Sequence, residues 1–138
     1  MNNEITNRSV KLARELFPAA HVSGKPNRVW HFCFAYRGGK LLAVGQNNMS
    51  VPCARTTKFY KRFKNKSLFP SRHAELDLIS QLWGRYHIDS SLKIVVLRLN
   101  KNGELKQSKP CVKCRKILDA LNLKKVYFSN DKGKFEKI

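Results

Sequence analysis

Apolar residues recur along the chain at spacings that predict helices and strands. In residues 4–17, the apolar positions Ile5, Leu12 and Leu16 are separated by seven and then four residues. This spacing places them on one face of an amphipathic helix. Pro18 is expected to end that helix, because proline interrupts the helical hydrogen bonds.

The next two apolar segments have the composition of paired strands. Residues 29–36 are rich in aromatic and β-branched side chains, Arg37-Gly38-Gly39-Lys40 supplies a turn, and residues 41–44 are apolar again. We interpret them as a β-hairpin. Residues 45–72 show no regular pattern, and a loop of that length in a compact domain is usually functional or disordered.

The second half of the chain alternates helices with strands. The elements predicted there are a helix over 73–86, a strand over 92–99, a helix from Pro110 through Leu121, and strands over 125–129 and 134–138. The order α-β-β-α-β-α-β-β predicts a layered α/β fold. At 138 residues, the chain has the length of one domain, spanning 1–138.

The hydropathy pattern contains no candidate membrane span. The longest apolar runs, such as residues 94–97, are far shorter than a bilayer requires. The N-terminus lacks the basic start, apolar stretch and cleavage site of a secretion signal. We therefore expect no membrane partner and a cytosolic or nuclear location, where the four cysteines would stay reduced.

The chain is strongly basic. It carries 28 Lys and Arg against 9 Asp and Glu, for a formal net charge of +19. Such a charge creates a positive potential over much of the surface and favours nucleic acid as a partner. The alternative is that the charge serves only to keep the protein in solution.

Two short motifs contain residues that bind metals and move protons. They are His73-Ala74-Glu75 and, after 34 intervening residues, Pro110-Cys111-Val112-Lys113-Cys114. Cys111 and Cys114, three residues apart on a helix, lie on one face, and the helix N-terminus favours their thiolate forms. With His73 as the third ligand, they would hold zinc and leave the fourth tetrahedral position for water, as in catalytic zinc sites.

In this arrangement Glu75 acts on protons rather than on the metal. Zinc lowers the pKa of a bound water toward roughly 7, which provides a nucleophile at neutral pH. Glu75 would take the proton of that water and return a proton later in the reaction. One carboxylate would thus serve first as base and then as acid.

Together the two motifs match the H-x-E … P-C-x-x-C pattern, so the chain resembles the zinc-dependent cytidine and deoxycytidylate deaminases. The resemblance implies the three-layer α/β/α cytidine-deaminase-like fold, with a mixed five-stranded sheet and an antiparallel C-terminal hairpin. It also implies that Asn47, in Gly45-Gln46-Asn47, contacts the substrate sugar, with Asn48 as the rival position. Backbone groups of Ala74 and Cys111 are implied to face the base.

Other interpretations of the same cysteines stay open. A Cys-x-x-Cys pair also occurs in structural zinc sites and in redox proteins. A structural site would need a fourth ligand, such as Cys33, Cys53 or a distant histidine. Cys33 lies in an apolar strand and is interpreted as a core thiol, whereas Cys53 has no nearby partner cysteine. The non-enzymatic alternative is therefore a basic nucleic-acid-binding module with a structural zinc.

Two features bear on which substrate the enzyme would accept. The antiparallel closing hairpin resembles nucleoside deaminases and some toxin deaminases that act on polynucleotides. It differs from the tRNA adenosine deaminases, whose last strands run parallel, so cytosine is the expected base. His73 stands where enzymes acting on free cytidine typically have cysteine, which argues against a simple nucleoside substrate.

The stretch before His73 combines cations with aromatic side chains. Residues 55–72 contain no acidic residue, and the candidate nucleic-acid-binding residues are Arg55, Lys58, Phe59, Tyr60, Lys61, Arg62, Phe63, Lys64 and Arg72. Cations can contact phosphates while aromatic rings stack on unpaired bases. We therefore expect cytosine deamination in single-stranded or unpaired nucleic acid. The enzymatic alternative is a free cytidine, deoxycytidine or dCMP deaminase, and the oligomeric state stays open.

Overall fold

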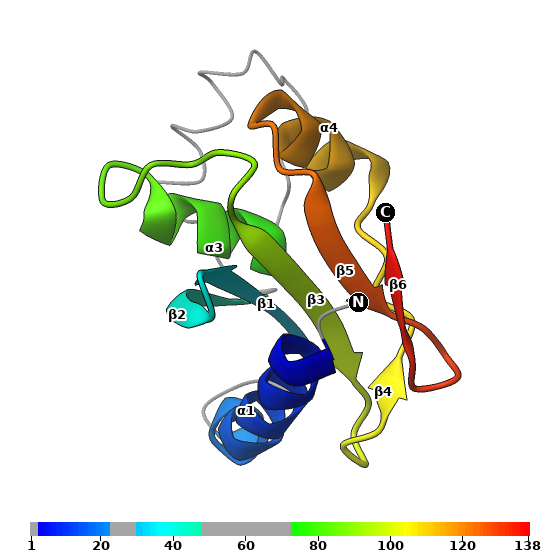
Figure 1. Ribbon diagram of the computed structural model, residues 1–138. Coiled ribbons are helices and arrows are strands. Elements are labelled where there is room, and N and C mark those ends of the chain that lie inside the picture. The colour runs from blue at the N-terminus through cyan, green and yellow to red at the C-terminus, as the bar shows by residue number, and fades with distance from the viewer. Residues whose placement is uncertain (1–2, 23–29, 48–72) are drawn as a thin grey trace.

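The computed structural model describes residues 3–22, 30–47 and 73–138 of the chain (Figure 1). Its helices are α1 (Asn3–Val22), α3 (Ala74–Leu82) and α4 (Val112–Ala120). Its strands are β1 (Trp30–Arg37), β2 (Lys40–Gln46), β3 (Lys93–Leu99), β4 (Leu105–Lys106), β5 (Lys125–Ser129) and β6 (Phe135–Lys137). None of these helices is both long and apolar enough to cross a membrane.

The strands form one mixed sheet in the order β2-β1-β3-β5-β6. β3 and β5 run parallel, and the other pairs along this path are antiparallel. The parallel pair is joined by α4, as expected for a crossover connection. The predicted mixed sheet with its antiparallel C-terminal hairpin is therefore confirmed. The two-residue strand β4, which the sequence pattern did not predict, adds to the edge of β3 beyond the end of β5.

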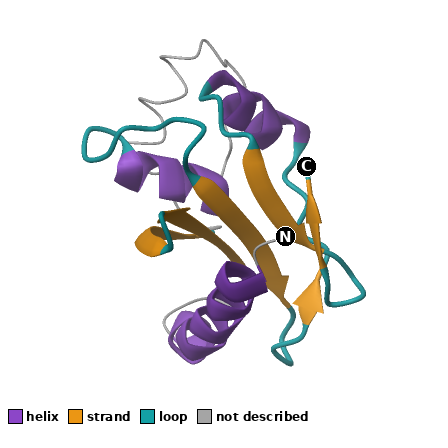
Figure 2. Ribbon diagram, viewed as in Figure 1, coloured by secondary structure: helices purple, strands orange, loops and turns teal. Residues whose placement is uncertain are grey.

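Helices cover both faces of the sheet, which confirms the predicted three-layer arrangement (Figure 2). α1 covers one face, where Ile5 and Ala13 pack against Phe32, Phe34 and Leu97. α3 and α4 cover the opposite face, over a second apolar core. That core contains, among others, Cys33, Leu78, Ile94, Val96 and Ile117.

Two helix ends differ from the sequence-based prediction. α1 continues through Pro18 to Val22, so the proline does not end it. A proline inside a helix removes one backbone hydrogen bond and can kink the helix without ending it. α3 ends at Leu82 instead of residue 86, because Trp83 leaves the helical conformation and Gly84 has a positive φ of 80°. Glycine after the last helical residue is a common helix stop.

The predicted β1–β2 hairpin is confirmed, and its turn explains the glycine pair. Gly38 and Gly39 have φ values of 57° and 79°, the left-handed conformation that two-residue hairpin turns require. β2 continues two residues beyond the predicted end and includes Gly45 and Gln46. These two residues contact α3 and so help to place it on the sheet.

β2 and α3 lie unusually close together at Gly45. A Cβ atom at this position would be 2.2 Å from the Ala74 carbonyl oxygen and 2.6 Å from the Leu78 nitrogen. Two side chains of α3 then bind the strand: Asp77 accepts a hydrogen bond from the Gln46 N–H at 2.9 Å, and Gln81 donates to the Val44 carbonyl at 2.7 Å. The first turn of α3 is therefore fixed against the end of β2.

Replacing Gly45 with Ala is expected to displace α3 and destabilise the protein by about 1–3 kcal/mol, because both close atoms belong to the backbone. Thermal unfolding checks this, with zinc affinity as a second readout, since α3 begins beside His73. Gly133→Ala is the control: nothing lies within 4 Å of its Cβ position, although its positive φ adds local strain. Equal zinc affinity in the two variants would show that Gly45 does not position α3.

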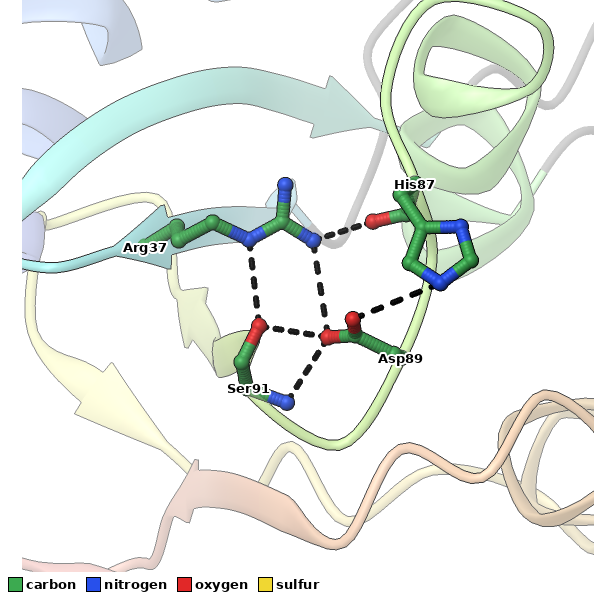
Figure 3. A network of polar contacts seen from close by, with 4 residues as sticks. All are labelled: Arg37, His87, Asp89 and Ser91. Atoms are coloured by element: carbon green, nitrogen blue, oxygen red, sulfur yellow. Dashed lines mark hydrogen bonds and ion pairs between the residues drawn. The ribbon is translucent and has the colours of Figure 1, made fainter.

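The other end of α3 is tied to the sheet by a polar network (Figure 3). Arg37, the last residue of β1, donates to the Ser91 hydroxyl at 3.1 Å and to the His87 carbonyl, and pairs with Asp89 at 3.5 Å. Asp89 also accepts hydrogen bonds from the Ser91 hydroxyl and N–H, which lower the pKa of its carboxyl. The loop between α3 and β3 is thereby held against β1.

Candidate active site

The first motif lies where α3 begins. His73 precedes the helix in an extended conformation, and its carbonyl accepts the first helical hydrogen bond, from the Asp77 N–H at 2.9 Å. The close approach at Gly45 and the hydrogen bond of Asp77 hold this part of the backbone against β2, and they thereby position the His73 side chain. This geometry gives His73 a defined position beside the carboxyl end of β3.

The second motif lies where α4 begins. Cys111 is the N-cap residue, and its Sγ accepts the Cys114 N–H at 3.5 Å. Pro110 therefore lies outside the helix, two positions before its first residue, Val112, and is not the first-turn proline that the sequence predicted. The i and i+3 spacing places both sulfur atoms on one side of the helix start, as predicted.

These two helix starts bring three metal-binding side chains together. The ligand atoms of His73, Cys111 and Cys114 all lie within 4.8 Å of one another. His73 Nδ1 is 3.6 Å from Cys114 Sγ and 4.0 Å from Cys111 Sγ. Tetrahedral zinc bonds of usual length would separate such atoms by about 3.6–3.8 Å. One imidazole and two thiolates at this spacing therefore fit zinc, and among the described residues the cluster has three ligands.

The segment leading into Cys111 is held by two buried serines. Ser108 donates its hydroxyl to the Val96 carbonyl at 2.9 Å and accepts the Ser129 N–H at 2.8 Å. The Ser129 hydroxyl is 2.9 Å from the Ser108 hydroxyl and 2.7 Å from the Lys106 carbonyl. These bonds anchor the approach to Cys111 on β3 and β5.

The two cysteines have opposite proton affinities. A hydrogen bond from the Cys114 side chain, with help from His73, lowers the pKa of Cys111 to about 4. The same hydrogen bond, together with burial, raises the pKa of Cys114. Cys111 is therefore the more acidic thiol of the pair, and binding a cation would favour releasing the Cys114 proton as well.

Glu75 lies in the first turn of α3, directly beside the cluster. Glu75 is only 5% exposed. Burial raises the pKa of the Glu75 carboxyl, while its own backbone N–H, the charge of His73 and the Cys114 thiol oppose the shift. A raised pKa suits a carboxyl that must both accept and return a proton.

The other predicted site residues lie at the end of β2, in α3, or outside the described residues. The Asn47 side chain accepts the His31 N–H at 3.0 Å, which fixes its amide at the end of β2. Ala74 is buried, and its carbonyl faces Gly45. Cys33 is fully buried, as predicted for a core thiol. Cys53, Asn48 and all candidate nucleic-acid-binding residues of the 55–72 stretch lie outside the described residues.

Sequence reasoning missed three polar residues on the face of the sheet that carries the cluster. His31 in β1, Arg98 in β3 and Lys106 in β4 lie on the face of the sheet that carries α3 and α4. His31 and Arg98 each interrupt an apolar strand at a position that alternation assigns to this face. A polar side chain at such a position is the signal that could have identified them.

The fold is shared with enzymes of known structure. No protein-family model matches the sequence, and no curated protein sequence matches it. Solved structures do match across nearly the whole chain, and they show that it has the cytidine-deaminase-like fold.

Two of these enzymes represent the likeness. The dCMP deaminase of cyanophage S-TIM5, in apo form, is 23% identical, with a TM-score of 0.55 over 95% of this chain and 86% of that one. Its complex with dCMP and dUMP is 21% identical, with a TM-score of 0.55 over 95% and 85%. The cytidine deaminase of Mycobacterium leprae is 19% identical, with a TM-score of 0.53 over 93% and 88%.

Proposed function

We propose that this protein is a zinc-dependent enzyme that hydrolyses cytosine to uracil and ammonia. The observation that carries the proposal is the position of Glu75, buried against a three-ligand cluster of His73, Cys111 and Cys114. A closed structural zinc site has four protein ligands and needs no buried carboxylate beside it. The cytidine-deaminase-like fold supports the same assignment.

In this mechanism the protein binds the metal and moves the protons. His73, Cys111 and Cys114 would hold zinc, which when bound lowers the pKa of a coordinated water toward roughly 7. Glu75 takes a proton from the attacking water and delivers it to N3 of cytosine as the new bond forms at C4. Glu75 then transfers a second proton to the amino group, the C4–N bond breaks, and ammonia leaves.

We further propose that the preferred substrate is cytosine in single-stranded or unpaired nucleic acid. The net charge of +19 supports a polyanionic partner. The sequence of residues 55–72 supports it as well, because seven of its residues are Lys or Arg and aromatic residues lie among them. A single phosphate needs only a few cations, whereas a polynucleotide can use many.

A free nucleotide is the second candidate substrate. The S-TIM5 enzyme, which shares the fold, was solved in complex with dCMP and dUMP. A free nucleotide has one sugar and one phosphate, so it would need only a few of the positive charges of this chain. The non-enzymatic alternative, a nucleic-acid-binding module with structural zinc, predicts that Glu75→Gln leaves the function intact.

The deciding experiment measures ammonia release and C-to-U conversion by the zinc-loaded protein. Its substrates are a single-stranded oligonucleotide pool, cytidine, deoxycytidine and dCMP at equal cytosine concentrations. We expect faster conversion of the polymer, and a rate on the polymer that falls steeply between about 50 and 200 mM salt as counterions compete. Conversion of the monomers alone, with a flat salt response, would contradict the nucleic-acid assignment and favour the nucleotide.

A further inference from the structure

Four polar residues cross the sheet in one row at the carboxyl end of β3. Asn47 is hydrogen-bonded to the backbone of His31, His31 is the register partner of Arg98, and Arg98 is the register partner of Lys106. Register partners point to the same face of a sheet. We name these four residues the polar row.

The polar row lies on the same face and at the same end of the sheet as the cluster of His73, Cys111 and Cys114. Cys33 and Val96, two residues from His31 and Arg98 along their strands, lie in the apolar core beneath α3 and α4. Side chains two residues apart share a face, so His31 and Arg98 extend this face beyond the core. The helix starts carrying His73 and Cys111 lie at the same end of the sheet, and their charges act on the His31 imidazole.

Arg98 is the unusual member of the polar row. Its Nε atom is buried, and no hydrogen-bond acceptor reaches it in the described part of the chain. Its Nη1 atom has one long contact, 3.4 Å, with the Gln107 carbonyl. In the described part of the chain, the ion pairs join Asp89 to Arg37 and to His87, and none involves Arg98 or Lys106. A partly buried guanidinium is costly without an anionic partner.

His31 adds a second donor without adding a charge. Burial, followed by the positive charges of Arg98 and His73, lowers the pKa of His31 to about 4, and Cys111 opposes the shift. The imidazole is therefore neutral at physiological pH and can donate one N–H. Arg98 provides the planar donor group that suits the oxygens of a phosphate.

From this geometry we propose that the polar row, with Arg98 as its main cation, binds the phosphate of the substrate beside the metal cluster. The site would take a phosphate ester of a cytosine nucleotide, either a free monophosphate or a phosphodiester in a strand. The proposal rests on the cytosine deaminase activity proposed above and adds a requirement for phosphate. Asn47 would then serve both the sugar and the organisation of this row.

The test compares zinc-loaded wild-type protein with Arg98→Gln on three substrates: dCMP, deoxycytidine and an oligonucleotide containing one cytosine. We expect kcat/KM for phosphate-bearing substrates to fall roughly 10–100-fold, as for the loss of a charge-assisted hydrogen-bond pair. The rate with deoxycytidine should change less than about threefold, because it has no phosphate to lose. Arg98→Lys should recover part of the loss, since it keeps the charge without the planar donor group.

Arg14→Gln is the matched control. Arg14 lies on α1, on the opposite face of the sheet, so its substitution removes the same charge without touching the polar row. A loss confined to dCMP would identify a free nucleotide as the source of the phosphate, and a loss shared with the oligonucleotide would identify a phosphodiester as well. Equal effects on deoxycytidine and dCMP, or equal effects of Arg14→Gln and Arg98→Gln, would overturn the proposal.

A binding measurement separates this proposal from the proposed function. In a Glu75→Gln background, titration calorimetry should show that dUMP binds more tightly than deoxyuridine, and that adding Arg98→Gln removes the difference. If wild-type protein converts cytosine compounds but dUMP and deoxyuridine bind equally, only the phosphate site is wrong. If no cytosine compound is converted, the proposed function itself is wrong.

Discussion

Glu75→Gln is expected to lower kcat for cytosine deamination by roughly 10²–10⁴-fold or more while the protein stays folded and loaded with zinc. Gln has nearly the shape of Glu, but it cannot accept the proton of water or return it to the leaving amino group. The carboxylate lies beside the cluster without completing it, so the three metal ligands are left in place. The measurements are C-to-U conversion, zinc content by mass spectrometry, and circular dichroism.

Glu136→Gln, on the exposed edge strand β6, is the control for this change. It removes the same charge far from the helix starts, and we expect wild-type conversion from it. If Glu75→Gln keeps more than about a tenth of the activity, the proton-transfer role is wrong. If wild-type protein shows no activity and the variant binds nucleic acid equally well, the non-enzymatic alternative gains support.

Cys114→Ala is expected to abolish stoichiometric zinc binding and, with it, all deaminase activity. Two remaining ligands hold zinc far more weakly than three, because each thiolate supplies charge as well as a bond. Zinc should raise the melting temperature of the wild-type protein by several degrees and leave that of the variant unchanged, since a ligand stabilises only the state that binds it. Thermal unfolding with and without added zinc is the measurement.

The matched control is Cys33→Ala, the same substitution at another buried cysteine. Cys33 is fully buried in the core beneath α3, so its loss should cost some packing energy and leave zinc binding intact. The comparison also separates two kinds of zinc site. Complete unfolding of Cys114→Ala, with Cys33→Ala still folded, would indicate a structural zinc instead of a catalytic one.

The cluster of His73, Cys111 and Cys114 could be predicted from the sequence because two of its three residues are close together in the chain. Cys111 and Cys114 are brought together by one helical turn, and a helix start follows from the apolar spacing behind each motif. Only the approach of His73 to these cysteines is long-range, and the match to the H-x-E … P-C-x-x-C pattern implied it. The structure now gives the distances, 3.6 and 4.0 Å.

Residues that act through strand register could not be predicted in the same way. Arg98 stands opposite His31 only because β1 and β3 pair antiparallel in one particular register, and Lys106 stands opposite Arg98 through the two-residue strand β4. The sequence pattern shows that these strands exist without showing which residues stand opposite one another. The predicted end of α3 was wrong for another reason. Tyr86 continues the apolar spacing, whereas the backbone at Gly84 ends the helix at Leu82.

The two halves of the cluster are fastened to different parts of the sheet. His73 is carried by α3, which Gly45 and Asp77 hold against β2, whereas Cys111 follows the buried Ser108, which binds β3 and β5. In the folded sheet β3 lies between β1 and β5, so the two halves meet only where both pairings are present. Zinc can therefore engage all three ligands only when folding is nearly complete. Bound zinc should slow unfolding and leave the folding rate almost unchanged, so that it adds kinetic stability to the assembled sheet.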